Sequence, residues 1–394
     1  MVTLLLLLLS ISVTAFKQIP VGYFSSMLGP LWPGLSYFGM RQTETCMASV
    51  LRLEIISHKS RQNEFVARPI PEFAKKLTGQ DLVDYVNLVQ PFFVANLSTL
   101  TEEQRKALIM DERFLEENPE NGYSVGEEVE YNGQIPESYD AREHYPQCAS
   151  LQLIRDQSAC GSCWAVSAAS AMSDRLCIQS KGKKTALVSD ADILSCCKYW
   201  LFSCGRGCQG GYPIRAWQYV RKYGTCSGGP FDPNEKGVCK PYPFYPCRRH
   251  EGKPYYGPCP AKGFDTPECK KECQTGFNKK YDEDKIKAKN EYQVKNNEEA
   301  IQKEILVNGP VQAGFLVYED LYNYKKGVYV HTAGRRLGGH AVKIIGWGVE
   351  KGVKYWLIAN SWNLDWGENG YLRMLRGSNH CSIESMVVAG MMEV

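Results

Sequence analysis

The 394-residue sequence has little excess charge, few histidines and no long apolar run beyond its first residues. Its 46 Lys and Arg residues face 43 Asp and Glu residues, and a net charge of +3 argues against a nucleic-acid-binding protein. Only six histidines are available as metal ligands. No later stretch approaches the ~18 apolar residues of a transmembrane helix. The content of 44% hydrophobic and 23% charged residues excludes disorder as the overall state.

Cysteine, in contrast, is abundant. Fourteen of the sixteen cysteines lie between Cys148 and Cys273, and only Cys46 and Cys381 lie outside this region. Such density indicates either disulfides formed in an oxidising compartment or a set of metal sites. The spacing alone does not give the connectivity of disulfides.

The N-terminus favours the disulfide interpretation. The apolar run Val2–Leu9 is followed by the small residue Ala15 before Phe16. This pattern predicts a secretory signal peptide at residues 1–16, with a membrane anchor as the alternative. Secretion permits disulfides, and Asn96 in Asn-Leu-Ser then becomes a candidate glycosylation site, although chance often produces this tripeptide.

Charge divides the rest of the chain. Residues 17–67 carry no catalytic motif and remain an unassigned extension. Residues 68–134 hold 6 basic and 13 acidic residues, whereas residues 135–394 hold 35 and 27. Opposite net charge predicts that the first part packs on the second as a removable prosegment, although solvated faces would give similar counts. Apolar spacing predicts helices at 82–89 and 100–114.

The region after Gln134 divides into a helical and a strand-rich half. Cys163 to Ile178 is rich in alanine and predicts a buried helix, with its larger apolar residues on one face. Cys196 to Cys273 is rich in loops, and apolar runs after Val311 predict strands. This order indicates an α+β protein with two subdomains and a cleft between them.

The most specific string is Cys160-Gly161-Ser162-Cys163-Trp164. A thiol at the first turn of a helix feels the positive end of the helix dipole, which favours a nucleophilic thiolate at Cys163. His340 can serve as its base, and Asn360 can hold the imidazole in the productive tautomer. Gln157 can donate its amide to a developing oxyanion beside the Cys163 backbone N–H.

Three alternatives compete with this interpretation. Cys160 and Cys163 have the spacing of a thiol–disulfide oxidoreductase, but that function leaves His340 and Asn360 unexplained. A non-catalytic binding module on the same fold would not need the nucleophile. Zinc binding at Cys204-x-x-x-Cys208 or Cys269-x-x-x-Cys273 is the weakest alternative.

These motifs resemble the papain-like cysteine proteases, and within them the cathepsin B group. The resemblance covers Ile135 to the C-terminus and rests on the nucleophile string and on three others: Cys208-Gln209-Gly210-Gly211-Tyr212-Pro213, Gly338-Gly339-His340, and Tyr355–Trp362. It implies a papain-like fold with a helical left domain, a β-barrel-like right domain and the cleft between them.

The resemblance also implies how such a protein is made, activated and localised. It predicts a zymogen whose propeptide, residues 68–134, lies in the cleft as an inhibitor and is cut near Ile135. The active form would be a monomer without cofactor or metal, hydrolysing proteins and peptides and open to cystatin-type inhibitors. It would reach the lysosome or the extracellular space, including a gut lumen, without binding membranes or nucleic acid.

One spacing points to the cathepsin B subgroup. Cys163 and His340 are 177 residues apart, compared with ~130–150 in ordinary papain-like enzymes. The excess resembles the occluding loop, here Cys247 to Cys259, which captures the C-terminal carboxylate of a substrate and confers dipeptidyl carboxypeptidase activity. Of two family histidines only His250 is kept. Arg249 replaces the other, and we expect it to pair with Asp156.

The resemblance further assigns substrate contacts to Gly210, Gly211, Gly339, Trp362, Met386 and His250. Met386 stands where cathepsin B places a glutamate in the second specificity pocket, so Phe-Arg substrates should outperform Arg-Arg ones. The string Tyr355–Ser361 with Asp365–Glu368 is similar to a motif of cathepsin B-like enzymes from blood-feeding nematodes, which makes haemoglobin a candidate substrate. The same residues also fit a buried strand and turn.

Finally, the resemblance sorts twelve cysteines into six disulfides: Cys148–Cys177, Cys160–Cys208, Cys196–Cys269, Cys197–Cys204, Cys239–Cys273 and Cys247–Cys259. Apart from the nucleophile, three cysteines remain. Cys46 would leave with the prosegment, Cys381 is expected to be a buried thiol, and Cys226 has no assignment.

Overall fold

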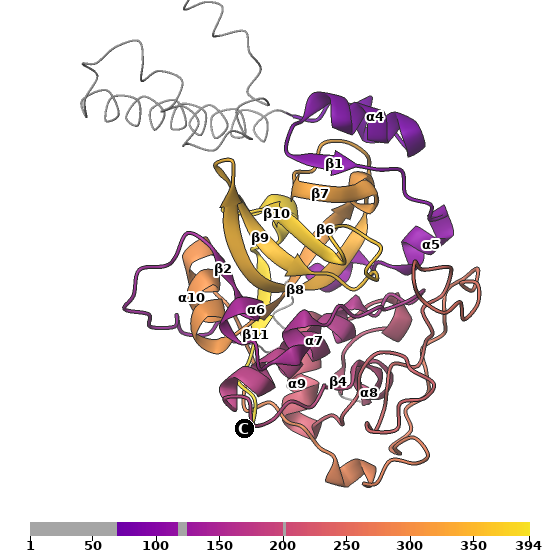
Figure 1. Ribbon diagram of the computed structural model, residues 1–394, viewed down its shortest axis with the longest axis vertical. Helices are drawn as coiled ribbons and strands as arrows, with labels where there is room; N and C mark the ends of the chain where they lie inside the picture. The colour runs from indigo at the N-terminus through magenta and orange to yellow at the C-terminus, as the bar shows by residue number, and fades with distance from the viewer. Residues whose placement is uncertain (1–68, 117–123, 200–201) are drawn as a thin grey trace, which may run out of the picture. The chain divides into compact units, whose positions relative to one another are not determined.

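The computed structural model describes residues 69–116, 124–199 and 202–394 (Figure 1). The predicted signal peptide, the extension at 17–67 and Cys46 lie outside the described residues. The helices are α4 (Gly79–Val89), α5 (Glu102–Ala107), α6 (Ala141–His144), α7 (Cys163–Gln179), α8 (Asp190–Cys196), α9 (Pro213–Tyr223) and α10 (Glu298–Asn308). The strands are β1 (Phe93–Ala95), β2 (Tyr139–Asp140), β3 (Lys198–Tyr199), β4 (Phe202–Ser203), β5 (Tyr292–Gln293), β6 (Val311–Tyr318), β7 (Tyr324–Tyr329), β8 (Arg336–Glu350), β9 (Val353–Ala359), β10 (Tyr371–Leu375) and β11 (Met386–Ala389).

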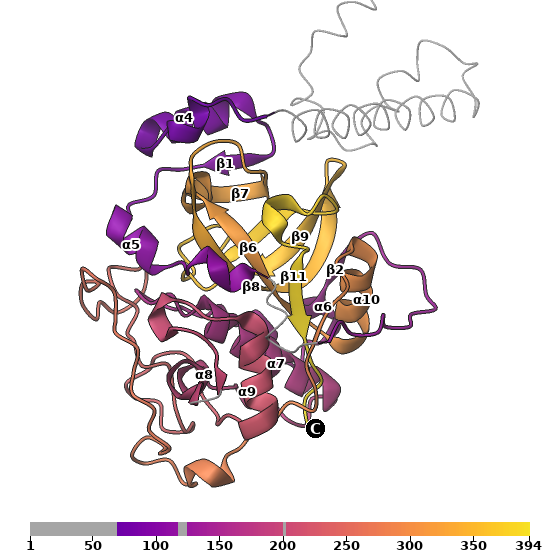
Figure 2. The same ribbon diagram turned by 180° about the vertical axis from the view of Figure 1, so that it is seen from behind.

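The predicted α+β architecture is confirmed. Helices α7, α8 and α9 gather on one side, and strands β6 to β10 form a curved sheet on the other, as both views show (Figures 1 and 2). The strand order in the large sheet is β1-β7-β10-β9-β8-β6-β11-β5. The long strand β8 runs antiparallel to both β6 and β9 and packs against α7.

Helix α7 is buried over almost its whole length, not only on the one apolar face expected from the sequence. Its many Ala and Ser residues allow neighbouring elements to approach closely on every side. Even its charged residues are paired internally: Arg175 donates to Glu304 at 2.7 Å, and one carboxylate oxygen of Asp174 accepts from Lys343 of β8 at 2.5 Å. A charge can be buried at such low cost only when it is paired in this way.

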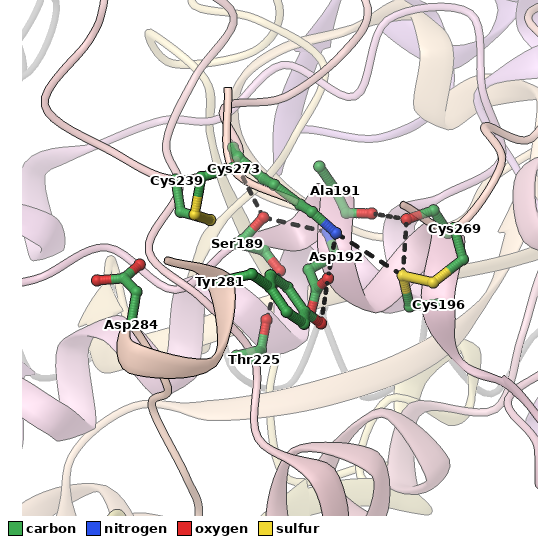
Figure 3. A network of polar contacts seen from close by, with 12 residues as sticks. Ser189, Ala191, Asp192, Cys196, Thr225, Cys239, Cys269, Cys273, Tyr281 and Asp284 are labelled. Carbon is green, nitrogen blue, oxygen red and sulfur yellow. Dashed lines mark hydrogen bonds and ion pairs between the residues drawn. A yellow bond between two sulfur atoms is a disulfide. The ribbon is translucent and has the colours of Figure 1, made fainter. Parts of the chain in front are cut away.

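A buried polar network holds the loop-rich region to α8 (Figure 3). Asp192 of α8 accepts hydrogen bonds from Lys240 at 2.7 Å and from the Tyr281 hydroxyl at 2.9 Å. Ser189 caps the helix by accepting from the Asp192 backbone N–H, and its hydroxyl donates to the Lys240 carbonyl at 2.8 Å. The network therefore holds the loops around Lys240 and Tyr281 against α8, in a region that has few helices and strands of its own.

The N-terminal segment, which we define as residues 69–116, lies along the sheet and then crosses toward α7. Strand β1 pairs antiparallel with β7, and the predicted helix at 82–89 is confirmed as α4. The single helix predicted at 100–114 is wrong. Helix α5 ends at Ala107, and Met110 forms a β-bridge with Gly339 instead. Pairing with the cleft wall outweighs local helical periodicity here. The prediction failed because sequence spacing carries no information about the partner strand.

Candidate active site

Cys163 is the first residue of α7, and its side chain is completely buried and free of disulfide bonds. The helix N-terminus favours a thiolate at this position. Burial nevertheless raises the pKa of the Cys163 thiol to about 12, although hydrogen bonds to the backbone of Ala341 and Trp164 oppose the rise. In this covered state the thiol is therefore protonated at neutral pH.

The imidazole of His340 is fixed by Asn360. The Nε2 atom of His340 lies 2.8 Å from the Oδ1 atom of Asn360, which also accepts the backbone N–H of Ser361 at 2.8 Å. Because a carbonyl oxygen can only accept, Nε2 carries the hydrogen and Nδ1 keeps its lone pair. Nδ1 makes no hydrogen bond with any residue that the structure describes. Burial lowers the pKa of His340 to about 4, so the ring is neutral above that pH and presents a free basic nitrogen.

Trp362 shields this hydrogen bond. Its ring lies against His340 with the centroids 4.7 Å apart, and Phe315 meets the imidazole edge-on at 5.7 Å. The indole N–H of Trp362 donates to the Leu108 carbonyl at 3.3 Å. Trp362 was predicted as a substrate contact, and in this state it contacts the N-terminal segment.

Gln157 also binds the N-terminal segment. Its Nε2 atom donates to the carbonyl of Leu108 at 3.0 Å and to that of Cys160 at 2.8 Å. Two residues that the sequence interpretation missed hold Gln157 in place. The Ser361 hydroxyl donates to its Oε1 atom, and the Tyr242 hydroxyl donates to its backbone carbonyl, both at 2.7 Å. Position next to Asn360 was the one sequence signal that could have indicated Ser361.

The N-terminal segment fills the cleft beside these residues. Met110 and Gly339 exchange two backbone hydrogen bonds of 2.8 Å, as paired antiparallel strands do. Gly210 has a φ of +120°, and a Cβ atom there would lie 2.6 Å from the Phe114 ring. Glycine is therefore required at Gly210 both by its backbone conformation and by the chain lying over it. Gly211 instead packs against the Trp164 ring.

An apolar pocket adjoins this stretch. It is lined by Phe114, Tyr212, Pro213, Ile214, Met386 and Val388 together with Gln293 and Glu116. Phe114 of the N-terminal segment packs edge-on against Tyr212, with the ring centroids 5.0 Å apart. Of the residues lining the pocket, the one carboxylate, Glu116, belongs to the N-terminal segment, so the wall around Met386 offers no anion of its own.

The loop from Cys247 to Cys259 lines a small pocket together with Leu108 and Asp156. The His250 ring is buried, with Nδ1 2.6 Å from Asp365 and Nε2 3.1 Å from the Cys247 carbonyl. The expected pairing of Arg249 with Asp156 is wrong. His250 approaches Asp156 at 3.9 Å, whereas the guanidinium of Arg249 is exposed and lies 4.8 Å above the Tyr255 ring. Stacking on an aromatic face lets Arg249 keep its water shell, which a buried pair would remove.

Six disulfides lie within the described part of the chain, and they join the same twelve cysteines in the pairs that the family resemblance implies. Because Cys160 is bonded to Cys208, it does not form a redox pair with Cys163. This removes the main support for the oxidoreductase alternative. Cys381 is a free, partly buried thiol, and Cys226 is free and fully buried in an apolar cluster with Cys239 and Tyr281.

The sequence profile described as papain family cysteine protease matches residues 135–391. The chain belongs to this family. A cathepsin B-like cysteine proteinase of Ostertagia ostertagi is 47% identical over 83% of this chain and 94% of its own length. A gut-specific cysteine proteinase of Caenorhabditis elegans is 46% identical over 81% and 92%. These relatives place the chain among the cathepsin B-like enzymes.

A solved structure agrees with this placement of the papain-family chain. Procathepsin B S9 from Trypanosoma congolense is similar with a TM-score of 0.67 and 35% identity, covering 82% of this chain and 100% of that one. Its proform supports a zymogen for this papain-family enzyme as well. Among residues 69–116, 124–199 and 202–394, no helix combines the length and apolarity needed to cross a membrane.

Proposed function

We propose that this enzyme hydrolyses peptide bonds through a thiolate–imidazolium pair formed by Cys163 and His340. The observation that carries the proposal is the hydrogen bond from His340 Nε2 to Asn360, because it leaves Nδ1 as the basic nitrogen. His340 takes the thiol proton, and the Cys163 sulfur attacks the substrate carbonyl. His340 then returns the proton to the leaving amine, and water hydrolyses the thioester that remains.

Gln157 stabilises the oxyanion in this scheme. Its Nε2 atom already binds a peptide carbonyl, that of Leu108, so a substrate carbonyl can take the same position beside the Cys163 backbone N–H. Gly210, Gly211 and Gly339 leave room for the backbone of the substrate. The Met386 pocket receives an apolar side chain.

The N-terminal segment acts as the propeptide that keeps the enzyme latent. It fills the cleft, and burial beneath it holds both Cys163 and His340 in their neutral forms. Removal of residues 68–134 lets water return, which brings the two pKa values together and favours the ion pair. The exposed position of Gln134, before Ile135, supports cleavage at this point.

The loop that carries His250 makes the enzyme a dipeptidyl carboxypeptidase as well as an endopeptidase. His250 and Arg248 line the space at the closed end of the cleft, where a C-terminal carboxylate would lie. The His250→Ala variant should lose dipeptide release from peptide C-termini while it retains cleavage of internal bonds. Equal loss of both activities would contradict this role of the loop.

The destination of the enzyme is the secretory pathway, ending in the lysosome or outside the cell. Six disulfides and an exposed Asn96 in a glycosylation tripeptide support this assignment, and the gut-specific relative makes a gut lumen one such destination. The protein is a monomer, with proteins and peptides as its substrates and cystatin-type proteins as its inhibitors.

The decisive experiment compares two single-atom changes in the cleaved enzyme. Cys163→Ser should abolish peptide hydrolysis, whereas Cys381→Ser, which changes another free thiol, should retain it. Insulin reduction is measured in parallel, because a thiol–disulfide oxidoreductase would lose that activity instead. Hydrolysis that survives in the Cys163→Ser variant would refute the proposed nucleophile.

A further inference from the structure

Two adjacent arginines lie at the start of strand β8: Arg336 is its first residue, four residues before His340, and Arg335 directly precedes it. Arg335 and Arg336 are both more than half exposed, and each pairs with a carboxylate of the N-terminal segment. Arg335 lies 3.0 Å from Glu102, and Arg336 lies 3.1 Å from Glu112. At ~3.3 Å per strand residue, Arg336 lies roughly 13 Å along the strand from the proposed base.

The two arginines differ in what remains after the N-terminal segment is removed. Arg335 also lies 3.4 Å from Glu319, a buried carboxylate of the part that stays. For Arg336, Glu112 is the one ion-pair partner within the part of the chain that the structure describes. Loss of the N-terminal segment therefore leaves Arg336 as the cation without its partner.

The N-terminal segment also indicates where a bound peptide would run. The Leu108 carbonyl accepts a hydrogen bond from the Gln157 side chain, and Met110 pairs with Gly339 through both its backbone N–H and its carbonyl. Glu112 is two residues further along the same stretch. Its side chain therefore marks a place that a side chain of another peptide in the cleft can reach.

A cavity beside this stretch has walls of unequal charge. The carboxylates that line it, Glu103, Asp111 and Glu112, come from the N-terminal segment. The wall contributed by the remaining domain carries two cations, Arg336 and Lys262, and no carboxylate. Two cations facing one cavity attract an anion and disfavour a third cation.

We propose that Arg336, assisted by Lys262, forms a cationic subsite that accepts an acidic side chain of the substrate peptide. The proposal rests on the proposed peptidase function and names a preference within it. In the uncleaved protein, Glu112 occupies this subsite. In the cleaved enzyme, a Glu or Asp side chain close to the scissile bond takes its place.

The test uses the cleaved enzyme and internally quenched peptides with amidated C-termini, so that side chains are the only carboxylates. Glu is compared with Gln at each of the four positions on either side of the scissile bond. At one position Glu should raise kcat/KM about two- to fivefold, as expected for an exposed ion pair, and 0.5 M salt should remove most of the gain.

Variants separate this proposal from the proposed function. Arg336→Gln should bring the ratio of the Glu-peptide rate to the Gln-peptide rate close to one, and Lys262→Gln should lower this ratio. Arg335→Gln, the matched control, should leave it unchanged because Glu319 already neutralises Arg335. A ratio near one at every position, or one that survives in Arg336→Gln, overturns the subsite. Failure of the wild type to cleave even the Gln peptides overturns the peptidase function, and the subsite with it.

Discussion

The Nε2 atom of Gln157 lies 3.0 Å from the carbonyl oxygen of Leu108, so the amide that would stabilise an oxyanion already holds a peptide carbonyl. The N-terminal segment thus covers the active site and also uses its hydrogen-bond donors. Displacement by substrate exchanges one carbonyl for another at the same donor. Under the proposed function, inhibition and catalysis would therefore depend on the same hydrogen-bond donor.

Replacing Gln157 should impair the chemical step more than substrate binding. We expect Gln157→Ala to lower kcat by roughly 10²–10³-fold with little change in KM, because an oxyanion forms only in the transition state. Steady-state kinetics on the cleaved enzyme measure this. Ser361→Ala, which removes only the hydroxyl that orients Gln157, should give a smaller loss. A kcat within threefold of wild type in Gln157→Ala would exclude the amide from catalysis.

The thiol of Cys163 should react slowly while the N-terminal segment is in place. Burial raises the pKa of Cys163 to about 12, so at pH 7 nearly all of it is the unreactive thiol. Alkylation of Cys163 by iodoacetamide, followed by mass spectrometry of its peptide, should be about tenfold or more slower before cleavage than after. Equal rates in the two forms would contradict the latency argument.

Met386 should set the preference of the second specificity pocket. Since its wall offers no anion once Glu116 has left, Phe-Arg substrates should exceed Arg-Arg substrates by roughly 10- to 100-fold in kcat/KM. Met386→Glu should raise Arg-Arg hydrolysis, while Met386→Gln, of similar shape and no charge, should not. Comparable wild-type rates for the two substrates would be incompatible with this pocket.

His380 should make the cleaved enzyme less stable in acid. Its Nε2 atom accepts the backbone N–H of His331 at 2.8 Å, and burial, with a contribution from His331 that Asp320 opposes, lowers its pKa to about 4. The unfolded chain, with a pKa near 6.5, binds the extra proton first as the pH falls. Stability should therefore decline between pH 6.5 and 4, by as much as about 3 kcal/mol.

Denaturant unfolding at pH 7 and at pH 4 measures this effect of His380. The His380→Gln variant keeps an acceptor but does not titrate, so its unfolding free energy should change less between the two pH values. If wild type and variant lose the same stability on acidification, the decline originates at other groups.

The sequence predicted the residues that share short strings and the segments with strong periodicity. The nucleophile string, the helix that follows it, and the strands around His340 were found because each pattern is local. Ser361 and Tyr242 were missed, since a hydroxyl that positions another side chain across the fold leaves no local signal. The predicted partner of Arg249 was wrong for the same reason, because the sequence does not show which of several possible partners a loop side chain contacts.

The break in the helix predicted at 100–114 has a related cause. Residues 108–114 carry helical spacing, yet Met110 makes two backbone hydrogen bonds with Gly339 of the cleft wall, and only a short 3-10 helix forms after it, at Glu112–Leu115. Tertiary pairing overrides propensity where a chain lies in a groove built by another part of the protein. The backbone conformation of such a segment depends on the site that it covers.

Strand β1 is the outermost strand of the sheet, where it covers the edge of β7 and pairs Val94 with Lys326. Once residues 68–134 are cut away, β7 presents a row of unpaired backbone groups to the solvent, the kind of edge on which proteins aggregate. Lys325 and Lys326, both exposed on this strand, repel a second strand of the same sequence. If residues 68–134 are removed as proposed, these two lysines would protect the exposed edge of β7 from self-association.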